Sequence, residues 1–166
     1  MRLRYWLAAW CGTVALAMAA CDPQRVEKLE EGVSTEVQVR QQFGEPVTVT
    51  VEADGTRVLE YPRQPEGWTN YVIKVGPDGK MSSLRQLLND DNFARVQPGM
   101  DKLQVRKLLG RHAKATPYAL KKEEHWDWRY RPDPNTSRIF TAVFGPEGKV
   151  LRTEKTDDTR DTSGGK

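Results

Sequence analysis

The sequence contains few cysteines and histidines, and this scarcity excludes several classes of function. Among its 166 residues there are two Cys and two His. His112 and His125 have no metal-ligand spacing to each other or to a cysteine, so no zinc site is predicted. The sequence also lacks a Gly-x-Ser-x-Gly motif, a phosphate-binding loop and a His-Glu-x-x-His motif. We therefore expect a protein without a metal, a cofactor, a small-molecule substrate or enzymatic activity.

An excess of charge of one sign is also missing. The chain has 26 basic and 23 acidic side chains, a net charge of +3. Cleavage after residue 20 would remove Arg2 and Arg4 and leave 24 basic against 23 acidic side chains. Such a balance provides no basic field for nucleic acid, so nucleic-acid binding is not expected. The apolar fraction of 37 % is enough for one compact unit or two very small ones.

The first 20 residues have the layout of a secretory signal peptide. A basic start, "MRLR", is followed by the apolar run "YWLAAWCGTVALAMAA" and then by the polar stretch "DPQRVEKLEEG" after Cys21. The apolar run is short for a membrane-spanning helix, which needs roughly 20 apolar residues. Residues 1–20 are therefore predicted to be a signal peptide.

Cys21 is the predicted site of lipid attachment. The sequence "MAAC" resembles a lipobox, the bacterial lipoprotein signal in which the cysteine is acylated and becomes the first mature residue. Met18 departs mildly from that pattern, because a branched aliphatic residue is commoner there. Two alternatives are an ordinary thiol after a plain signal peptide and an uncleaved membrane anchor. Because Cys11 would leave with the signal peptide, no intramolecular disulfide is expected.

Four phrases occur twice in the same order, which indicates an internal duplication. "QVRQQFG" at 38–44 returns as "QVRKLLG" at 104–110. "VGPDGK" at 75–80 returns as "FGPEGK" at 144–149. Two weaker matches are "EGVSTEV" with "PGMDKL" and "EYPRQP" with "RYRPDP". The chain is therefore predicted to consist of a signal peptide, 1–20, a first repeat, 21–88, a second repeat, 89–155, and a tail, 156–166.

Each repeat is predicted to begin with two helices. Ser34 and Asp101 are suitable N-caps for the second helix of each repeat, and Gly44 and Gly110 are suitable stops. A shorter helix is expected before each of them, over the stretches 23–29 and 90–96. Apolar residues recur on one face of these helices, which indicates packing against a core.

Three strands are predicted to follow in each repeat. In "EEHWDWRY" the aromatic residues alternate with polar ones, as in a half-buried strand. "TRVLEY", "NYVIKV" and "RIFTAVF", with Met81–Leu88 and Val150–Lys155, complete the set. The predicted fold is α+β: two tandem helix-helix-strand-strand-strand repeats, with an antiparallel sheet covered by helices on one face. The tail from Thr156 has no apolar residue and is expected to be disordered.

Single residues offer few candidate sites. His125 is expected on the polar side of its strand and His112 in a loop. Glu123 and Glu124 are adjacent and should point to opposite faces, so they are not expected to act as a carboxylate pair. Trp126 and Trp128 are expected in the core, and the alternative is an exposed aromatic patch for a partner. Trp68, in the loop "PEGWTN", is the candidate contact for a protein partner.

These features together resemble the BamE (SmpA/OmlA) lipoprotein family. The resemblance is carried by the lipobox cysteine, by "EGVSTEVQVRQQFGEP" and "PGMDKLQVRKLLG", and by the "GPDGK" turn. Two departures are the second copy of the unit and the absence of the proline after the glycine phrase in that copy. The same helix-helix-sheet unit in tandem is also similar to the secreted β-lactamase inhibitor proteins.

The resemblance implies a non-catalytic accessory subunit of the machinery that assembles β-barrels in the outer membrane. Its partners would be subunits of that machinery, and acyl chains on Cys21 would hold it in the membrane, facing the periplasm. Asp22 resembles a signal for retention in the inner membrane, which is the alternative location. The alternative function is an inhibitor-like module that binds a periplasmic enzyme through its sheet face and Trp68. A polar sheet face would favour the scaffold, and an exposed aromatic patch would favour the inhibitor.

Overall fold

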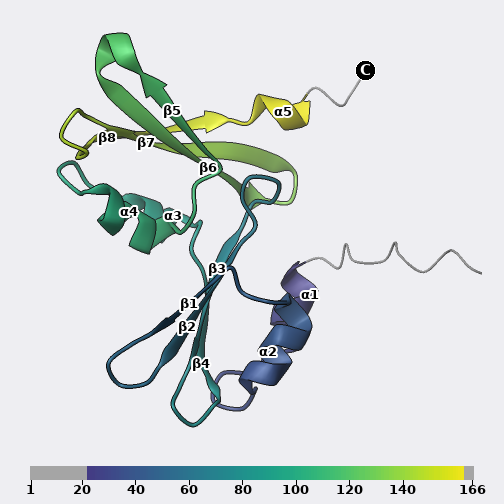
Figure 1. Cartoon of the computed structure of the whole chain (residues 1–166). Coiled ribbons are helices and arrows are strands. Elements are labelled where there is room, and N and C mark those ends of the chain that lie inside the picture. The colour runs from purple at the N-terminus through teal and green to yellow at the C-terminus, as the bar shows by residue number, and fades with distance from the viewer. Residues whose placement is uncertain (1–21, 163–166) are drawn as a thin grey trace, which may run out of the picture.

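The chain forms an α+β structure with two four-stranded antiparallel sheets (Figure 1). This computed structural model describes residues 22–162. The predicted signal peptide and the lipidation site Cys21 lie outside this range. Within it, none of the helices combines the length and hydrophobicity needed to cross a membrane.

The first half contains two short helices and one sheet. Helices α1 (Asp22–Val26) and α2 (Glu36–Phe43) precede strands β1 (Thr48–Val51), β2 (Arg57–Pro62), β3 (Asn70–Val75) and β4 (Met81–Gln86). The four strands pair in sequence order. Val39 and Phe43 of α2 belong to one buried cluster with Leu59, Tyr61, Tyr71, Ile73, Val75 and Met81.

The second half repeats this order of elements. Helices α3 (Asp90–Ala94) and α4 (Lys102–Leu109) precede β5 (Lys114–Tyr118), the 3-10 turn η1 (Ala119–Lys121), β6 (Glu123–Asp133), β7 (Thr136–Phe144) and β8 (Val150–Asp157). A final helical turn, α5, spans Thr159–Thr162. The buried cluster of this half is formed by Leu88, Phe93, Val96, Val105, Leu109, Trp128, Tyr130, Phe140, Ala142, Phe144 and Val150.

The duplicated phrase has the same structural role in both halves. Gln38 and Gln104 each complete a capping box with the N-cap residue three positions earlier. These N-caps are Thr35 and Asp101, so the prediction of Ser34 is wrong. Ser34 is instead buried, and its hydroxyl accepts a hydrogen bond from the Glu30 amide. At the helix ends, Gly44 and Gly110 have positive φ values of 81° and 73°, which explains the recurrent glycine.

Each sheet has four strands, so the predicted number of three is wrong. The additional strands are β1 and β5, which form the first edge of each sheet. Both are short and largely exposed. Their side chains therefore do not alternate between buried and exposed, and that alternation was the signal used to predict strands.

The predicted disordered tail is also wrong for residues 156–162. Strand β8 extends to Asp157, and α5 follows. Asp158 is only 1 % exposed, and it accepts a hydrogen bond of 2.5 Å from Nε of Arg129. A buried carboxylate is tolerated here because an arginine from a distant strand neutralises it.

Arg129 also ties the two halves together. The side-chain amide of Gln64 donates to the Arg129 carbonyl at 2.8 Å and accepts from the Arg129 amide at 3.2 Å. The guanidinium group donates to the carbonyls of Pro65 and Glu66, both at 3.3 Å. The loop between β2 and β3 is thereby held against β6 of the second sheet.

We predict that Asp158→Asn lowers the free energy of unfolding by about 3 kcal/mol, because it removes the carboxylate charge that compensates the buried Arg129 guanidinium. The matched control is Asp157→Asn. Asp157 is 79 % exposed and lies 3.6 Å from Arg138, so we expect a loss below about 1 kcal/mol. Urea denaturation of the two variants at pH 7 measures both values. Equal losses would contradict a special role for the buried pair.

Candidate functional site

A groove lies on the face of the first sheet opposite its buried cluster. Its volume is about 390 Å³. Its floor includes Val58 and Val72 of neighbouring strands, and the end of α4 from the second half forms one wall. The groove is lined by Thr50, Glu52, Val58, Glu60, Pro62, Asn70, Tyr71, Val72, Lys74, Leu87, Arg106, Lys107, Gly110 and Arg111.

Asn70 positions the helical wall of this groove. It is 1 % exposed, and its Nδ2 donates to the carbonyls of Leu109 and Arg111 at 2.7 and 2.8 Å. These carbonyls lie at and just beyond the end of α4, where backbone acceptors lack partners within the helix. A β-carbon at Gly110 would lie 3.1 Å from the Asn70 Nδ2 atom, so the helix stop also permits this close approach.

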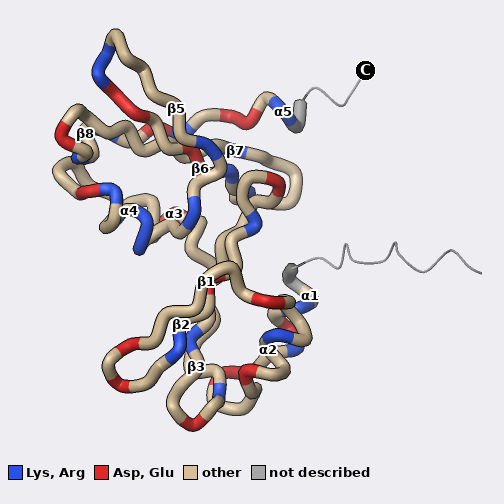
Figure 2. The backbone as a smooth tube through the Cα atoms, viewed as in Figure 1, with Lys and Arg blue, Asp and Glu red and all other residues tan. Residues whose placement is uncertain are grey.

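Basic side chains are in excess around the groove. Glu52 pairs with Lys74 at 2.9 Å, and Glu60 lies 3.9 Å from Arg106. Lys107 and Arg111 also line it, which gives four cations against two carboxylates. Figure 2 shows basic residues of α4 on the side of the second half nearest the first sheet. The groove therefore suits an extended segment with small apolar groups and negative charge.

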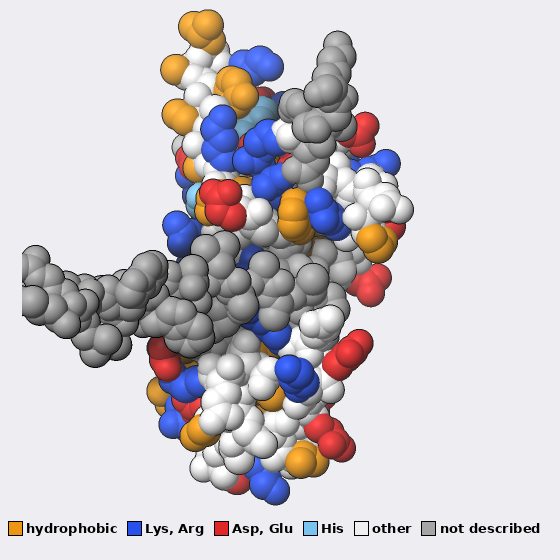
Figure 3. Space-filling model, turned by 90° about the vertical axis from the view of Figure 1, so that its right-hand side faces the viewer, with side chains coloured by type: hydrophobic (Ala, Val, Ile, Leu, Met, Phe, Trp, Pro, Cys, Tyr) orange, Lys and Arg blue, Asp and Glu red, His pale blue; other side chains and the backbone are white. Residues whose placement is uncertain are grey.

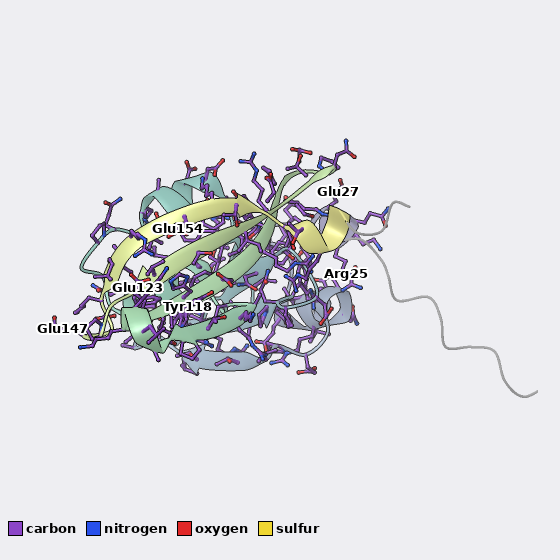
Figure 4. The ribbon with its side chains drawn as sticks, turned by 90° about the horizontal axis from the view of Figure 1, so that it is seen from above. Arg25, Glu27, Tyr118, Glu123, Glu147 and Glu154 are labelled. Atoms are coloured by element: carbon purple, nitrogen blue, oxygen red, sulfur yellow. The ribbon has the colours of Figure 1, made fainter. Side chains whose placement is uncertain are left out.

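The corresponding face of the second sheet is polar. Glu123 accepts from Arg152 at 2.7 Å and lies 3.1 Å from Nε2 of His125. Arg152 also donates to Glu154 at 2.9 Å, and the rings of Tyr118 and His125 are 4.3 Å apart. Figure 4 looks down on this face, where Tyr118, Glu123 and Glu154 come from three different strands.

Hydrogen bonds from Arg152 and His125 lower the pKa of Glu123 to about 2. At neutral pH this carboxylate is ionised and cannot serve as a general acid. Within residues 22–162, Glu123 is the hydrogen-bond partner of His125, and no serine or cysteine pairs with that ring. The cluster can therefore present charge and hydrogen-bonding groups, but it does not pair His125 with a nucleophile.

The structure places the other predicted residues on the core side of the second sheet, with different degrees of burial. Glu124 pairs with Lys102 at 2.5 Å, away from Glu123, as strand alternation predicts. Trp128 is fully buried and Trp126 partly so, in agreement with the core prediction. His112 lies in the predicted loop, with its ring 4.4 Å from that of Trp126. Burial, followed by the charge of Arg106, lowers its pKa.

Trp68 packs at the junction of the two halves. The guanidinium carbon of Arg131 lies 3.5 Å from the centre of its ring, and that of Arg129 lies 5.2 Å away. The ring is therefore already engaged by cations of the second half. Its role as a partner contact stays a prediction.

Sequence reasoning missed the groove. Its residues come from both halves of the chain. In the sequence of α4 alone, the basic residues have the spacing of an ordinary solvent-exposed helix face. The exposed hydrophobic side chains lie elsewhere. Several gather at the tip of the β5–β6 hairpin (Figure 3), where Leu120 is fully exposed.

Comparison with known proteins yields little beyond the structure itself. No protein-family model matches the sequence, and no curated protein matches it. One solved structure, a DUF4309 family protein (YjgB) from Bacillus subtilis, aligns with 82 % of this chain and 86 % of its own. The sequence identity is 20 % and the TM-score is 0.33. This likeness is too low to carry an argument about function.

We predict that Arg152→Met raises the pKa of Glu123 from about 2 toward 4.5, because the strongest hydrogen bond to the carboxylate is lost. Since the folded-state pKa of Glu123 is depressed, the stabilisation is present at neutral pH and is lost as the pH falls toward 2. Carboxyl carbon chemical shifts followed by NMR against pH measure this directly. Arg138→Met is the matched control and should leave Glu123 unchanged. An ordinary pKa for Glu123 in the parent protein would contradict the arrangement.

Proposed function

We propose that this chain is a lipid-anchored, non-catalytic binding module of the bacterial cell envelope. It resembles the BamE accessory subunit of the outer-membrane β-barrel assembly machinery. The observation that carries the proposal is the groove, since its wall and floor come from different halves and its excess charge is basic. Its partner is a protein of the assembly machinery that inserts an acidic, extended segment.

The finer architecture belongs to the same proposal. The two halves are tandem repeats of one unit, and in each unit the helices cover one face of the sheet. The matching element order and the two capping boxes support this. Isolated bridges also occur at equivalent places, Thr35 with Lys80 and Asp101 with Lys149.

The polar face of the second sheet favours a scaffold over an inhibitor. Arg152, Glu123 and Glu154 form ion pairs on that face, and an exposed aromatic patch was the feature expected of an inhibitor. The mechanism is positional: acyl chains on Cys21 hold the module at the membrane and raise its effective concentration near its partner. The outer membrane is the proposed location, and retention in the inner membrane through Asp22 is the alternative.

The second candidate function is an inhibitor-like module that captures a periplasmic enzyme. A concave groove on a sheet face is compatible with such binding. The partner would then be a soluble enzyme, and Trp68 would have to exchange its contacts with Arg129 and Arg131 for contacts with that enzyme.

The decisive test is affinity capture from crosslinked, detergent-solubilised envelopes with a tag after Lys166. We expect the β-barrel assembly subunits among the captured proteins. The variant Arg106→Glu/Lys107→Glu reverses the basic wall of the groove. We expect it to reduce their recovery at least about tenfold, which corresponds to about 1.4 kcal/mol, because an acidic segment would then meet like charge.

The control variant is Lys121→Glu/Lys122→Glu. It makes the same change of charge at the hairpin between β5 and β6, outside the groove. Recovery should stay at the parental level. Equal losses in the two variants would show that net charge, rather than the groove, governs capture. Recovery of a soluble enzyme without assembly subunits would establish the second candidate.

A separate prediction concerns the anchor. Cys21→Ser removes the thiol that would receive the acyl chains, so the protein should move from the membrane pellet to the soluble periplasmic fraction. Cell fractionation followed by immunoblotting measures the shift. Cys11→Ser should leave the protein in the membrane pellet. Continued sedimentation of Cys21→Ser with membranes would contradict lipid anchoring.

A further inference from the structure

Strand β1 leaves an exposed and uncharged edge on the first sheet. The segment Val47–Val51 reads "VTVTV", and β1 pairs on one side with β2. The Glu52 amide donates to the Thr56 carbonyl. In an antiparallel pair, residues whose backbone groups bond to the partner strand alternate with residues whose backbone groups point outward, so this bond determines which residues of β1 point outward. Val49 and Val51 therefore turn their backbone N–H and C=O groups away from β2. The Val47 amide instead donates to the Glu60 carbonyl at 2.9 Å, so the free edge is that of β1 itself, Thr48–Val51. Their side chains are 45 % and 64 % exposed.

The other sheet edges carry protective features. Pro117 interrupts the donors of β5, and Lys114 places a charge on that strand. The start of β4 is covered by the Ser34 carbonyl, which accepts from Met81 at 2.7 Å. The start of β8 is covered in the same way by Met100, which accepts from Val150 at 2.8 Å. Between residues 47 and 51 there is no proline, glycine or charged side chain.

The sequence of this edge is a palindrome. "VTVTV" reads identically in both directions, so two copies can pair antiparallel about Val49 with like residues opposite each other. Val49 meets Val49 of the second copy, and Thr48 meets Thr50. The valine pair then falls on one face and the two threonine pairs on the other, both of which are favourable cross-strand neighbours.

The flanking charges are compatible with the same register. Glu45 and Glu52 flank β1 and lie outside the paired residues Thr48–Val51. No two like charges meet, so the electrostatic penalty that usually prevents self-pairing of strands is avoided. The second copy is thus compatible with this edge in charge and matches it in side-chain pattern.

We propose that two copies of this protein associate through β1, in a two-fold symmetric antiparallel pair centred on Val49. The two four-stranded sheets would join into one continuous sheet of eight strands. One strand from each copy is smaller than a standard interface of about 800 Å² per partner, so the dimer is reversible rather than obligate. The pairing rests on the edge itself and does not depend on the proposed function.

The dimer would have a consequence for the groove. Thr50 and Glu52 line the groove and lie at the same edge. Pairing through β1 would place two grooves on one continuous sheet face, related by the two-fold axis. If the groove binds its partner as proposed, the dimer would be bivalent.

The test is disulfide crosslinking of the full chain with Cys11→Ser and Cys21→Ser as the background. In a hydrogen-bonded antiparallel pair, facing Cα atoms lie about 5.5 Å apart, within the range of a disulfide. Val49→Cys should give a covalent dimer on a non-reducing gel, at least about tenfold above the exposed control Val37→Cys on α2. Val51→Cys should not, because two Val51 residues would be about 13 Å apart along the strand.

A mixture of Thr48→Cys and Thr50→Cys chains, distinguished by tags of different size, should form the mixed dimer, because these residues face each other with Cα atoms about 4.5 Å apart. Equal yields from Val49→Cys, Val51→Cys and Val37→Cys would overturn the proposal, as would no crosslinking at all. Sedimentation velocity of the Cys21→Ser chain provides a second measurement. Val49→Lys should abolish its concentration-dependent dimer, and Val37→Lys should retain it. Circular dichroism confirms that each variant is folded.

Discussion

Arg129 makes the contacts on which the arrangement of the two halves depends. Its backbone exchanges two hydrogen bonds with the Gln64 side chain, and its guanidinium group binds Asp158 and two carbonyls of the first half. A buried charge requires such a complete set of partners, because desolvation is costly unless charge and hydrogen bonds are both compensated. Burial alone raises the pKa of Asp158, but the hydrogen bonds from Arg129 and Arg160 outweigh it and leave the pKa below its usual range.

The groove is a consequence of this junction. Asn70 binds the carbonyls at the end of α4, so the basic residues of that helix are held beside the open face of the first sheet. Without a fixed junction the wall and the floor would belong to two independent units. The polar contacts between the halves thus convert two small sheets into one surface with a defined shape and an excess of positive charge.

Much of the fold could be predicted from short-range patterns. The phrase with Gln38 and Gln104 predicted two helices and their glycine stops, and alternation through Trp126 and Trp128 predicted strand β6. Strand β1 could also have been found, since "VTVTV" alternates with period two after Pro46. Strand β5 was harder to predict, because it contains Pro117 and has no buried apolar residues that would give an alternating pattern.

The junction and the groove could not be predicted, since their partners are distant in sequence. Asp158 lies in a stretch without apolar residues, and its burial depends on Arg129, on another strand, together with the nearby Arg160. From the sequence, Trp68 was predicted to be a loop aromatic that contacts a partner. In the structure, the guanidinium group of Arg131 lies over its ring. Charges that appear solvated in the sequence can be structural when a long-range partner supplies the opposite charge.

The contacts of Arg129 should make the two halves unfold as one cooperative unit. Hydrogen exchange measured by mass spectrometry across a series of urea concentrations distinguishes joint from separate unfolding. Peptides from β2 and β3 should lose protection at the same midpoint as peptides from β6 and β7, because the halves unfold together. Two separate midpoints would show that the halves unfold independently and would contradict a groove of fixed shape between them.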